Sequence, residues 1–336
     1  MMVSANVSLF GWPKCVVFVN GQTRCVVTTD VGPRIVWLGH ADDTPTLENN
    51  IFGGFPAQMG KSGEADFQFR MGHRFWLAPE EAGPKTYDPD NHPVEDAVMD
   101  GLDFRIVQKP GFAGLQKSIR IRGYDHDQGG VWISHNLQNV GGDKVDGVAL
   151  WGLSGMAPNG IAIIPQPAFQ YHPAFAKAGA PPEQIGGFLS AQNVVRWPYT
   201  NLQDMRLMMS RKFMLLRQDP NVATCNVNKF GLSDVHWVAY LVKTGAGTRL
   251  FIKRLYFEKD KQHLHPDRGS VFETFVCGSF LELEETGQME DLPPTRSATP
   301  LVVRWSVHKI DRMPITLTDG WIDDNVVPLV GFTRES

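Results

Sequence analysis

This sequence of 336 residues has few cysteines and no long apolar run, and both deficits exclude classes of protein. Its four cysteines, Cys15, Cys25, Cys225 and Cys277, are too few and too scattered for a disulfide scaffold. No stretch approaches the roughly 20 apolar residues of a membrane-spanning helix, and the N-terminus lacks a basic region followed by an apolar one. We therefore expect a cytoplasmic protein with no membrane partner, although a chain trimmed of its signal peptide would look the same.

Basic charge and cofactor motifs are also lacking. The net charge of −4 leaves no basic footprint, so we expect no nucleic-acid partner. The Gly-Gly pairs build neither a phosphate loop nor a dinucleotide fingerprint, and no G-x-S-x-G elbow is present. His263 and His265, with Asp267, have a spacing that suits a metal, but they lie among charged residues typical of a surface loop. We expect neither a cofactor nor a metal.

Helical periodicity is lacking as well, since no long stretch repeats its apolar residues every 3.6 positions. Short β-branched and aromatic runs separated by Gly and Pro predict strands instead. One short helix is expected near Leu202 to Met208, and a short strand at Phe67 to Phe69. Many short strands indicate a single all-β domain over residues 1–336, a sandwich or a barrel. The other predicted strands are Lys14–Val19, Arg24–Thr29, Arg34–Leu38, Asp103–Gln108, Leu115–Arg122, Val131–Asn139, Ala149–Gly155, Ile161–Pro165, Lys212–Arg217, Val235–Lys243, Thr248–Tyr256, Ser270–Cys277, Gly278–Glu284 and Leu301–His308.

The strand Val131–Asn139 places a histidine on a rigid element. Side chains of a strand alternate between two faces, so His135 and Asn139 share one face with Val131, Ile133 and Leu137. An imidazole at the end of an apolar row is either a core histidine bonded to a backbone carbonyl or a catalytic group near an inward-facing surface.

Six polar or aromatic side chains crowd the segment from Arg70 to Glu81. Guanidinium groups bind sugar hydroxyls or carboxylates in a forked way, and an aromatic ring stacks on the apolar face of a pyranose. The alternative is a surface loop whose charges pair with one another. The residues in question are Arg70, His73, Arg74, Trp76, Glu80 and Glu81.

Carboxylates recur on two adjacent strands near the C-terminus. Glu282 and Glu284 share one strand face with Phe280, about 7 Å apart by strand geometry, and Glu273 lies on the preceding strand. Carboxylates beside aromatic rings can act as general bases. The alternative is a solvated outer face of an antiparallel sheet.

Together these motifs resemble the aldose 1-epimerase (galactose mutarotase-like) superfamily. His135 to Asn139 is similar to the family's strand motif, in which the histidine is the general acid. The segment Met71-Gly72-His73-Arg74-Phe75-Trp76 falls where the family has a segment that binds the sugar. The strand from Phe280 to Glu285 falls where the family has the glutamate that acts as the general base. The resemblance implies an all-β fold, a large antiparallel β-supersandwich that binds a sugar in an open groove.

The resemblance also implies a reaction without a cofactor, in which a base and an acid open and close the sugar ring. We assign Glu284 as the base and His135 as the acid. Because the family's Glu-Pro step is Glu284-Glu285 here, Glu282 is also a counterpart and Glu273 a rival base. A non-catalytic carbohydrate-binding protein and a glycan lyase or hydrolase, with Arg70 and Arg74 supplying positive charge, are the alternatives. The expected partner is a sugar or sugar-derived molecule, held by Arg70, His73, Arg74, Trp76, Glu80, Asn139 and Glu282.

Overall fold

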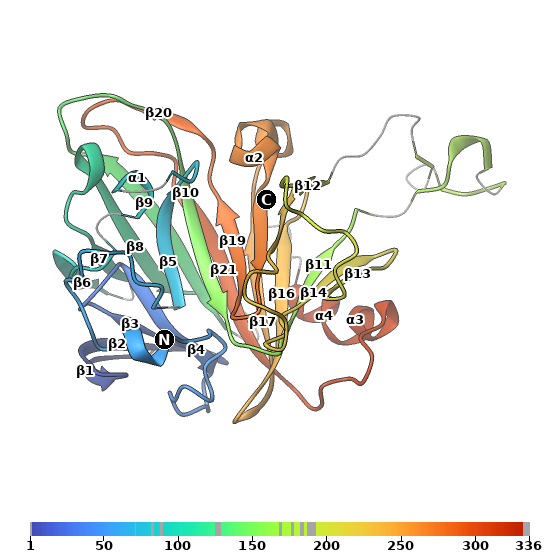
Figure 1. Cartoon of the computed structure of the whole chain (residues 1–336), viewed down its shortest axis with the longest axis horizontal. Helices are drawn as coiled ribbons and strands as arrows, with labels where there is room; N and C mark the ends of the chain where they lie inside the picture. Colours follow the sequence, from blue (N-terminus) through green and yellow to red (C-terminus); the bar gives the residue numbers. More distant parts are fainter. Residues whose placement is uncertain are drawn as a thin grey trace.

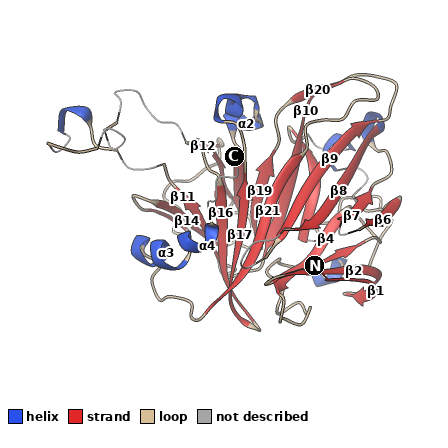
Figure 2. Cartoon of the chain, turned by 180° about the vertical axis from the view of Figure 1, so that it is seen from behind, coloured by secondary structure: helices blue, strands red, loops and turns tan. Residues whose placement is uncertain are grey.

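A computed structural model describes most of the chain. The described residues are 2–70, 72–81, 84–87, 90–101, 103–124, 129–167, 170–175, 178–181, 185–186 and 193–331. Among them, the paired strands form two large sheets whose neighbouring strands run antiparallel (Figure 1). Seen from the opposite side, strands dominate the molecule and the few short helices lie at its edges (Figure 2).

The first sheet has eleven strands and joins the N-terminal third of the chain to its C-terminal third. The centre of this sheet is made by β5, β10 and β19, which lie next to one another. In order across the sheet, the strands are β1 (Met2–Leu9), β2 (Trp12–Asn20), β3 (Thr23–Thr28), β4 (Arg34–His40), β5 (Gly72–Ala78), β10 (Val145–Met156), β19 (Leu281–Thr286), β18 (Phe272–Val276), β15 (Asn228–Leu232) and β12 (Val194–Arg196), with β20 (Glu290–Leu292) on β10.

The second sheet has ten strands, and β17 and β21 lie at its centre, with β9 next to β21. In order these strands are β13 (Leu207–Met209), β14 (Phe213–Arg217), β11 (Ile161–Pro165), β16 (Trp237–Thr244), β17 (Gly247–Leu255), β21 (Leu301–Ile310), β9 (Val131–Asn139), β8 (Leu115–Gly123), β7 (Asp103–Val107) and β6 (Asp96–Asp100). The described α-helices are α1 (Pro84–Tyr87), α2 (Pro266–Gly269), α3 (Asp319–Asn325) and α4 (Val327–Val330), and short 3-10 turns span Pro56–Gln58, Phe112–Gly114, Pro173–Phe175 and Lys259–Leu264.

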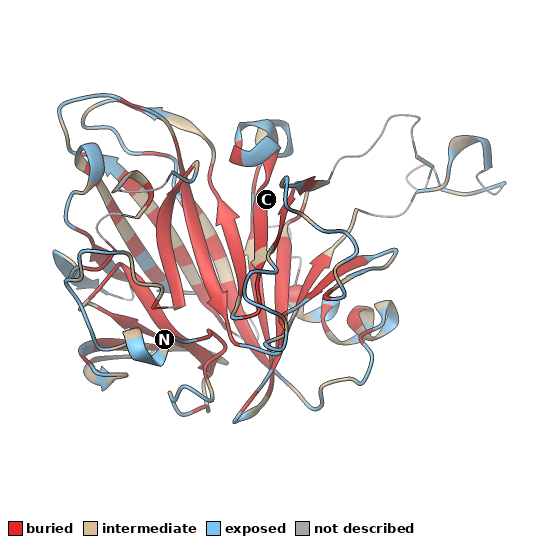
Figure 3. Cartoon of the chain, in the orientation of Figure 1, coloured by how far each residue is buried: buried red, intermediate tan, exposed pale blue. Residues whose placement is uncertain are grey.

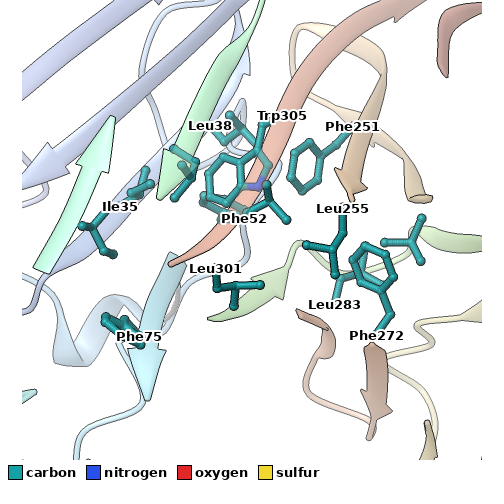
Figure 4. Close-up of a cluster of buried hydrophobic side chains, with 14 of the residues drawn as sticks. Ile35, Leu38, Phe52, Phe75, Phe251, Leu255, Phe272, Leu283, Leu301 and Trp305 are labelled. Carbon is teal, nitrogen blue, oxygen red and sulfur yellow. The ribbon is translucent and has the colours of Figure 1, made fainter. Parts of the chain in front are cut away.

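The inner faces of the two sheets share one large hydrophobic core. Trp305 from β21 contacts Phe52 and Phe251 edge to face in this core (Figure 4). Figure 3 shows that the central strands are buried along most of their length. A second apolar cluster covers the outer face of the ten-stranded sheet, where Ile322 of α3 and Val330 of α4 pack on its strands.

The expected large antiparallel β-supersandwich is confirmed by these two sheets. The strands predicted at Val131–Asn139 and Ile161–Pro165 have the observed bounds, and most of the others differ by a few residues. The short helix near Leu202 to Met208 is wrong, because Leu207–Met209 pairs with β14 as a strand. The short strand expected at Phe67 to Phe69 is also wrong, since these residues lie outside any strand.

Strand β5 was not predicted, although it lies in the middle of a sheet. All seven of its residues are buried, so its sequence shows no polar and apolar alternation. Gly72 opens the strand with a φ of 80°, and a Cβ there would lie 2.2 Å from the carbonyl oxygen of Ile35 on β4. Glycine therefore allows β4 and β5 to approach each other at this point.

Among the described residues, no helix has the length and apolar character needed to cross a bilayer.

Candidate functional site

Two clusters of polar side chains lie on opposite faces of the eleven-stranded sheet. In β19, Leu281 and Leu283 belong to the core between the sheets, so Glu285 points inward with them. Glu282 and Glu284 point to the outer face. Both faces of β19 are covered, because every one of its residues is buried.

A hollow of about 320 Å³ lies on the outer face, above β10, β15 and β18. Its wall contains three aromatic rings, those of Trp151, Trp197 and Tyr199, and its polar lining contains three carboxylates and one ammonium group. We call this cavity the outer hollow. The lining residues are Ala78, Pro79, Glu80, Trp151, Trp197, Tyr199, Lys229, Asp267, Glu273 and Thr286.

Lys229 of β15 bridges two carboxylates at the outer hollow. Its Nζ lies 2.8 Å from Glu273 Oε2 and 3.2 Å from Glu284 Oε2. The two glutamates are directly opposite each other on β18 and β19. The Nε1–H of Trp151 also donates to Glu284 Oε2 at 3.0 Å, and Lys229 Nζ lies 4.9 Å from the ring centroids of both Trp151 and Trp197.

Burial and mutual charge interactions shift the pKa values of Glu273 and Lys229. Burial raises the pKa of Glu273 well above its usual range, although the ammonium group of Lys229 opposes the shift. Burial by itself would lower the pKa of Lys229, but the carboxylates of Glu284 and Glu273 raise it above its ordinary value. Lys229 therefore holds its proton more tightly than an ordinary lysine, while Oε1 of Glu273 is buried and has no hydrogen-bond partner among the described residues.

Beside the outer hollow, Arg74 is held between two aromatic rings. Its guanidinium carbon lies 4.5 Å from the Phe69 centroid and 4.1 Å from the Trp76 centroid, and its Nη2 donates to Glu282 Oε1 at 2.6 Å. Burial raises the pKa of Glu282, and Arg74 opposes this shift. Arg74 and Glu282 thus form a buried ion pair next to the aromatic wall.

Arg70 and Glu80 complete the polar side chains around this face. Arg70 donates from Nη1 to Asn91 Oδ1 at 2.6 Å and pairs with Glu64 through Nη2. Glu80 lines the outer hollow and accepts a hydrogen bond from the hydroxyl of Tyr87 at 3.1 Å. Arg70 is thus buried, engaged by two partners and absent from the lining of the hollow, whereas Glu80 belongs to that lining.

The second cluster lies in the core between the two sheets. His73 of β5 and His135 of β9 approach to 2.7 Å between their Nε2 atoms, and each Nε2 lies 4.0 Å from Glu285 Oε1. Lys253 of β17 pairs with Glu285 Oε2 and donates to the carbonyl oxygen of Leu283 at 2.8 Å. None of these four side chains is exposed to solvent. We call this group the inner cluster.

Burial governs the charges of the inner cluster. It lowers the pKa of His135 to about 3 and that of His73 well below its usual range, the latter helped by the neighbouring His135. Burial raises the pKa of Glu285 to about 7, although Lys253 opposes the shift. Both imidazoles are therefore neutral at neutral pH.

The expected pairing of His135 with Glu284 across one hollow is wrong. His135 points into the core from the ten-stranded sheet, whereas Glu284 points to the outer face of the eleven-stranded sheet. His73 is also in the core, with a ring 4.7 Å from that of Trp305, so it does not line the outer hollow.

Asn139 is placed away from the outer hollow as well. It is buried, and its side chain holds a loop by donating to the carbonyl oxygens of Asp143 and Leu292 at 2.7 and 2.8 Å. Its Oδ1 accepts from the backbone N–H of Gly141 at 2.9 Å. These bonds use its polar atoms, so the expected contact between Asn139 and a sugar has no support in this geometry.

Of the residues expected to serve a site, Glu80 and Glu273 line the outer hollow, and Arg74, Trp76, Glu282 and Glu284 lie beside it. Sequence reasoning missed Trp151, Lys229 and Asp267. It also missed the use of Trp197 and Tyr199, although two aromatics flanking Pro198 in a turn are a signal for a binding surface. Lys229 is adjacent to no motif, so no pattern pointed to it.

The protein thus belongs, by fold, to the class of large two-sheet antiparallel β-sandwiches. The sequence matches no protein-family model and no curated protein. Among solved structures, the chain is similar to a TPR-domain containing protein from Parabacteroides distasonis, with a TM-score of 0.52 and 10% identity over 91% of this chain and 49% of that one. This chain therefore spans about half the length of that protein.

Two provisionally named aldose 1-epimerases are further structural neighbours. The protein from Klebsiella pneumoniae has a TM-score of 0.49 and 10% identity, with 88% of this chain and 79% of that chain covered. The protein from Escherichia coli has a TM-score of 0.47 and 11% identity, with 88% and 98% covered. At such identities the likeness concerns the fold.

Proposed function

We propose that this chain is a carbohydrate-binding protein and that the outer hollow is its sugar site. One observation carries the proposal: three aromatic rings and a buried carboxylate–ammonium cluster share a hollow of about 320 Å³. That volume is at the lower end of the range for small-molecule sites, which suits a monosaccharide. Aromatic rings stack on the apolar face of a pyranose, while carboxylates accept hydrogen bonds from its hydroxyls.

The charges of the lining favour a neutral sugar. Glu80, Asp267 and Glu273 supply carboxylates, whereas Lys229 is the one ammonium group among the lining residues, and it is already shared with Glu273 and Glu284. A uronate or a sugar phosphate would bring a further negative charge toward these carboxylates. We therefore expect neutral monosaccharides to bind more tightly than their acidic counterparts.

Mutarotation is a second candidate function, and the state of Glu273 favours it. The reaction needs a base for the anomeric hydroxyl and an acid for the ring oxygen, without a cofactor. Glu273 lines the hollow, burial raises its pKa well above its usual range so that it binds a proton more readily than an ordinary carboxylate, and its buried Oε1 has no hydrogen-bond partner among the described residues. Lys229, 2.8 Å from its other oxygen, holds its proton too tightly to act as the acid, so it orients this carboxylate and solvent would supply the proton to the ring oxygen. Glu273 thus replaces Glu284 as the proposed base.

The lyase or hydrolase alternative has less support. It relied on Arg70 and Arg74 to neutralise a uronate carboxylate. Both guanidinium groups are buried and paired with Glu64 and Glu282, which argues against that role.

A panel of neutral monosaccharides and matching uronates, added to the full chain while its melting temperature is followed, tests the binding proposal. We expect one or more neutral sugars to raise the Tm and the uronates to raise it less. A panel with no effect at saturating concentrations would contradict sugar binding. Polarimetry of the sugar that binds then separates a binding protein, which leaves anomer exchange at its spontaneous rate, from a mutarotase.

A further inference from the structure

The inner cluster is built from four strands of two sheets and plays no part in the proposed sugar site, and three of its side chains could hold a metal ion. His73 and Glu285 come from β5 and β19 of one sheet, and His135 comes from β9 of the other. We propose that these three side chains bind a single divalent metal ion of the zinc class, which ties the two sheets together from within the core. Two imidazoles and a carboxylate form a well-known ligand set for such ions.

The three donor atoms already lie at suitable distances from a common point. The separations are 2.7 Å between the two Nε2 atoms and 4.0 Å from each Nε2 to Glu285 Oε1. A triangle with these sides has a circumscribed circle of radius about 2.1 Å, and zinc binds nitrogen and oxygen ligands at about 2.0–2.2 Å. At that point the angle between the two nitrogens would be about 79° and each nitrogen–oxygen angle about 140°, so a tetrahedral site requires the imidazoles to move apart and the metal to lie out of the plane of the three donor atoms.

The far ring nitrogen of each histidine is already fixed by a hydrogen bond. His135 Nδ1 lies 3.2 Å from the carbonyl oxygen of Leu301, which only accepts, so Nδ1 carries the proton and Nε2 presents its lone pair. His73 Nδ1 lies 2.9 Å from Ser154 Oγ, a hydroxyl that can either donate or accept. Metal-binding histidines commonly have such outer partners, because these fix the ring and its tautomer.

Glu285 has one oxygen engaged and one available. Lys253 pairs with Oε2, whereas Oε1, buried and without a hydrogen-bond partner among the described residues, is turned toward the two histidines. Gly152 of β10 leaves space at this point. A Cβ on Gly152 would lie 2.5 Å from Glu285 Oε1 and 2.9 Å from His135 Nε2. A glycine therefore keeps open the volume next to two of the three donor atoms.

Metal content of the untagged full chain tests this inference. The protein is stripped with a chelator, loaded with Zn²⁺ or with Co²⁺ as a spectroscopic probe, and compared with His73→Gln and Gly152→Ala. His73→Gln removes one ligand, and Gly152→Ala blocks the site while keeping all three. The matched controls are His263→Gln, exposed on the 3-10 turn Lys259–Leu264, and Gly142→Ala, where a Cβ meets nothing within 4 Å.

We expect one metal equivalent per chain, a higher Tm with metal than without, and affinity lowered by about 100-fold in His73→Gln and Gly152→Ala but unchanged in the controls. If the wild-type chain, after stripping and reloading, holds less than about a tenth of an equivalent of metal, the inference is overturned, whatever amount of metal the variants bind. Loss of binding in His263→Gln with binding kept in Gly152→Ala would overturn it as well. Sugar binding at the outer hollow is measured separately and does not depend on this result.

Discussion

Glu284 and Glu285 are consecutive residues whose carboxylates lie on opposite faces of one sheet, each beside a lysine of its own. Glu284 Oε2 lies 3.2 Å from Lys229 Nζ on the outer face, and Glu285 pairs with Lys253 in the core. The period of two in a strand thus separates two adjacent acids into two different environments. The carboxylate of Glu284 pairs with a lysine that lines the outer hollow, and the carboxylate of Glu285 belongs to the inner cluster.

Lys229→Met should strongly destabilise the fold. It leaves the carboxylates of Glu273 and Glu284 buried without their cation, and removing one partner of a buried ion pair costs about 3–5 kcal/mol. Denaturant unfolding measures the change. The double variant Lys229→Met/Glu284→Gln should recover part of this loss, because one of the stranded charges is gone. The control is Lys243→Met on the exposed side of β16, and a loss in that control as large as in Lys229→Met would refute the explanation.

Tyr199→Ala should weaken sugar binding by about tenfold, since a stacked ring is worth roughly 1–2 kcal/mol at a well-formed site. Tyr199 is exposed, so the Tm without sugar should change little. Tyr256→Ala removes an exposed tyrosine that does not line the outer hollow and is the matched control. Equal sugar affinity in the two variants, measured by calorimetry, would place the sugar elsewhere.

The state of Glu273 predicts the pH dependence of any anomer exchange. A general base acts in its ionised form, and burial raises the pKa of Glu273 well above its usual range. The catalysed rate should therefore increase with pH until this raised pKa is passed, and then level off. Glu273→Gln should lower the rate by about 10²–10⁴-fold and abolish the pH dependence. NMR of the two anomers measures the rates, and an unaltered rate in Glu273→Gln would exclude this base.

Because of His265, the free energy of unfolding should decrease as the pH is lowered. Burial lowers the pKa of His265 below the 6.5 of an ordinary histidine, so as pH falls through this window the unfolded chain takes up a proton that the folded chain does not. The free energy of unfolding then decreases with decreasing pH. His265→Gln should flatten this slope by up to about 1.4 kcal/mol per pH unit. His263→Gln should keep the wild-type slope, and an identical slope in both variants would contradict the assignment.

The fold could be predicted from the sequence because most strands alternate. In β9, Val131, Ile133, His135, Leu137 and Asn139 are all buried while the intervening residues are not, as a period of two requires. Strand β5 could not be found this way, since both of its faces are covered and its polar residues are paired in the core or the wall. The terminal helices α3 and α4 are too short to show a helical period.

The site was only partly predictable for a related reason. Sequence alternation correctly separates Glu282 and Glu284 from Leu281 and Leu283, but it does not reveal what covers each face. The outer hollow takes Lys229 from β15, Glu273 from β18 and two aromatic rings from a turn after β12, and only the pairing of distant strands brings them together. A buried histidine and a catalytic histidine have the same sequence pattern, so the sequence alone does not decide whether His135 faces the core or a groove.

A crystal structure grown with the neutral monosaccharide that most raises the Tm tests the outer hollow most directly. We expect density for one pyranose against Trp197 and Tyr199, with a hydroxyl within hydrogen-bond distance of a carboxylate of the lining, Glu80 or Glu273. A sugar bound at another place, with the outer hollow empty, would contradict the proposed site.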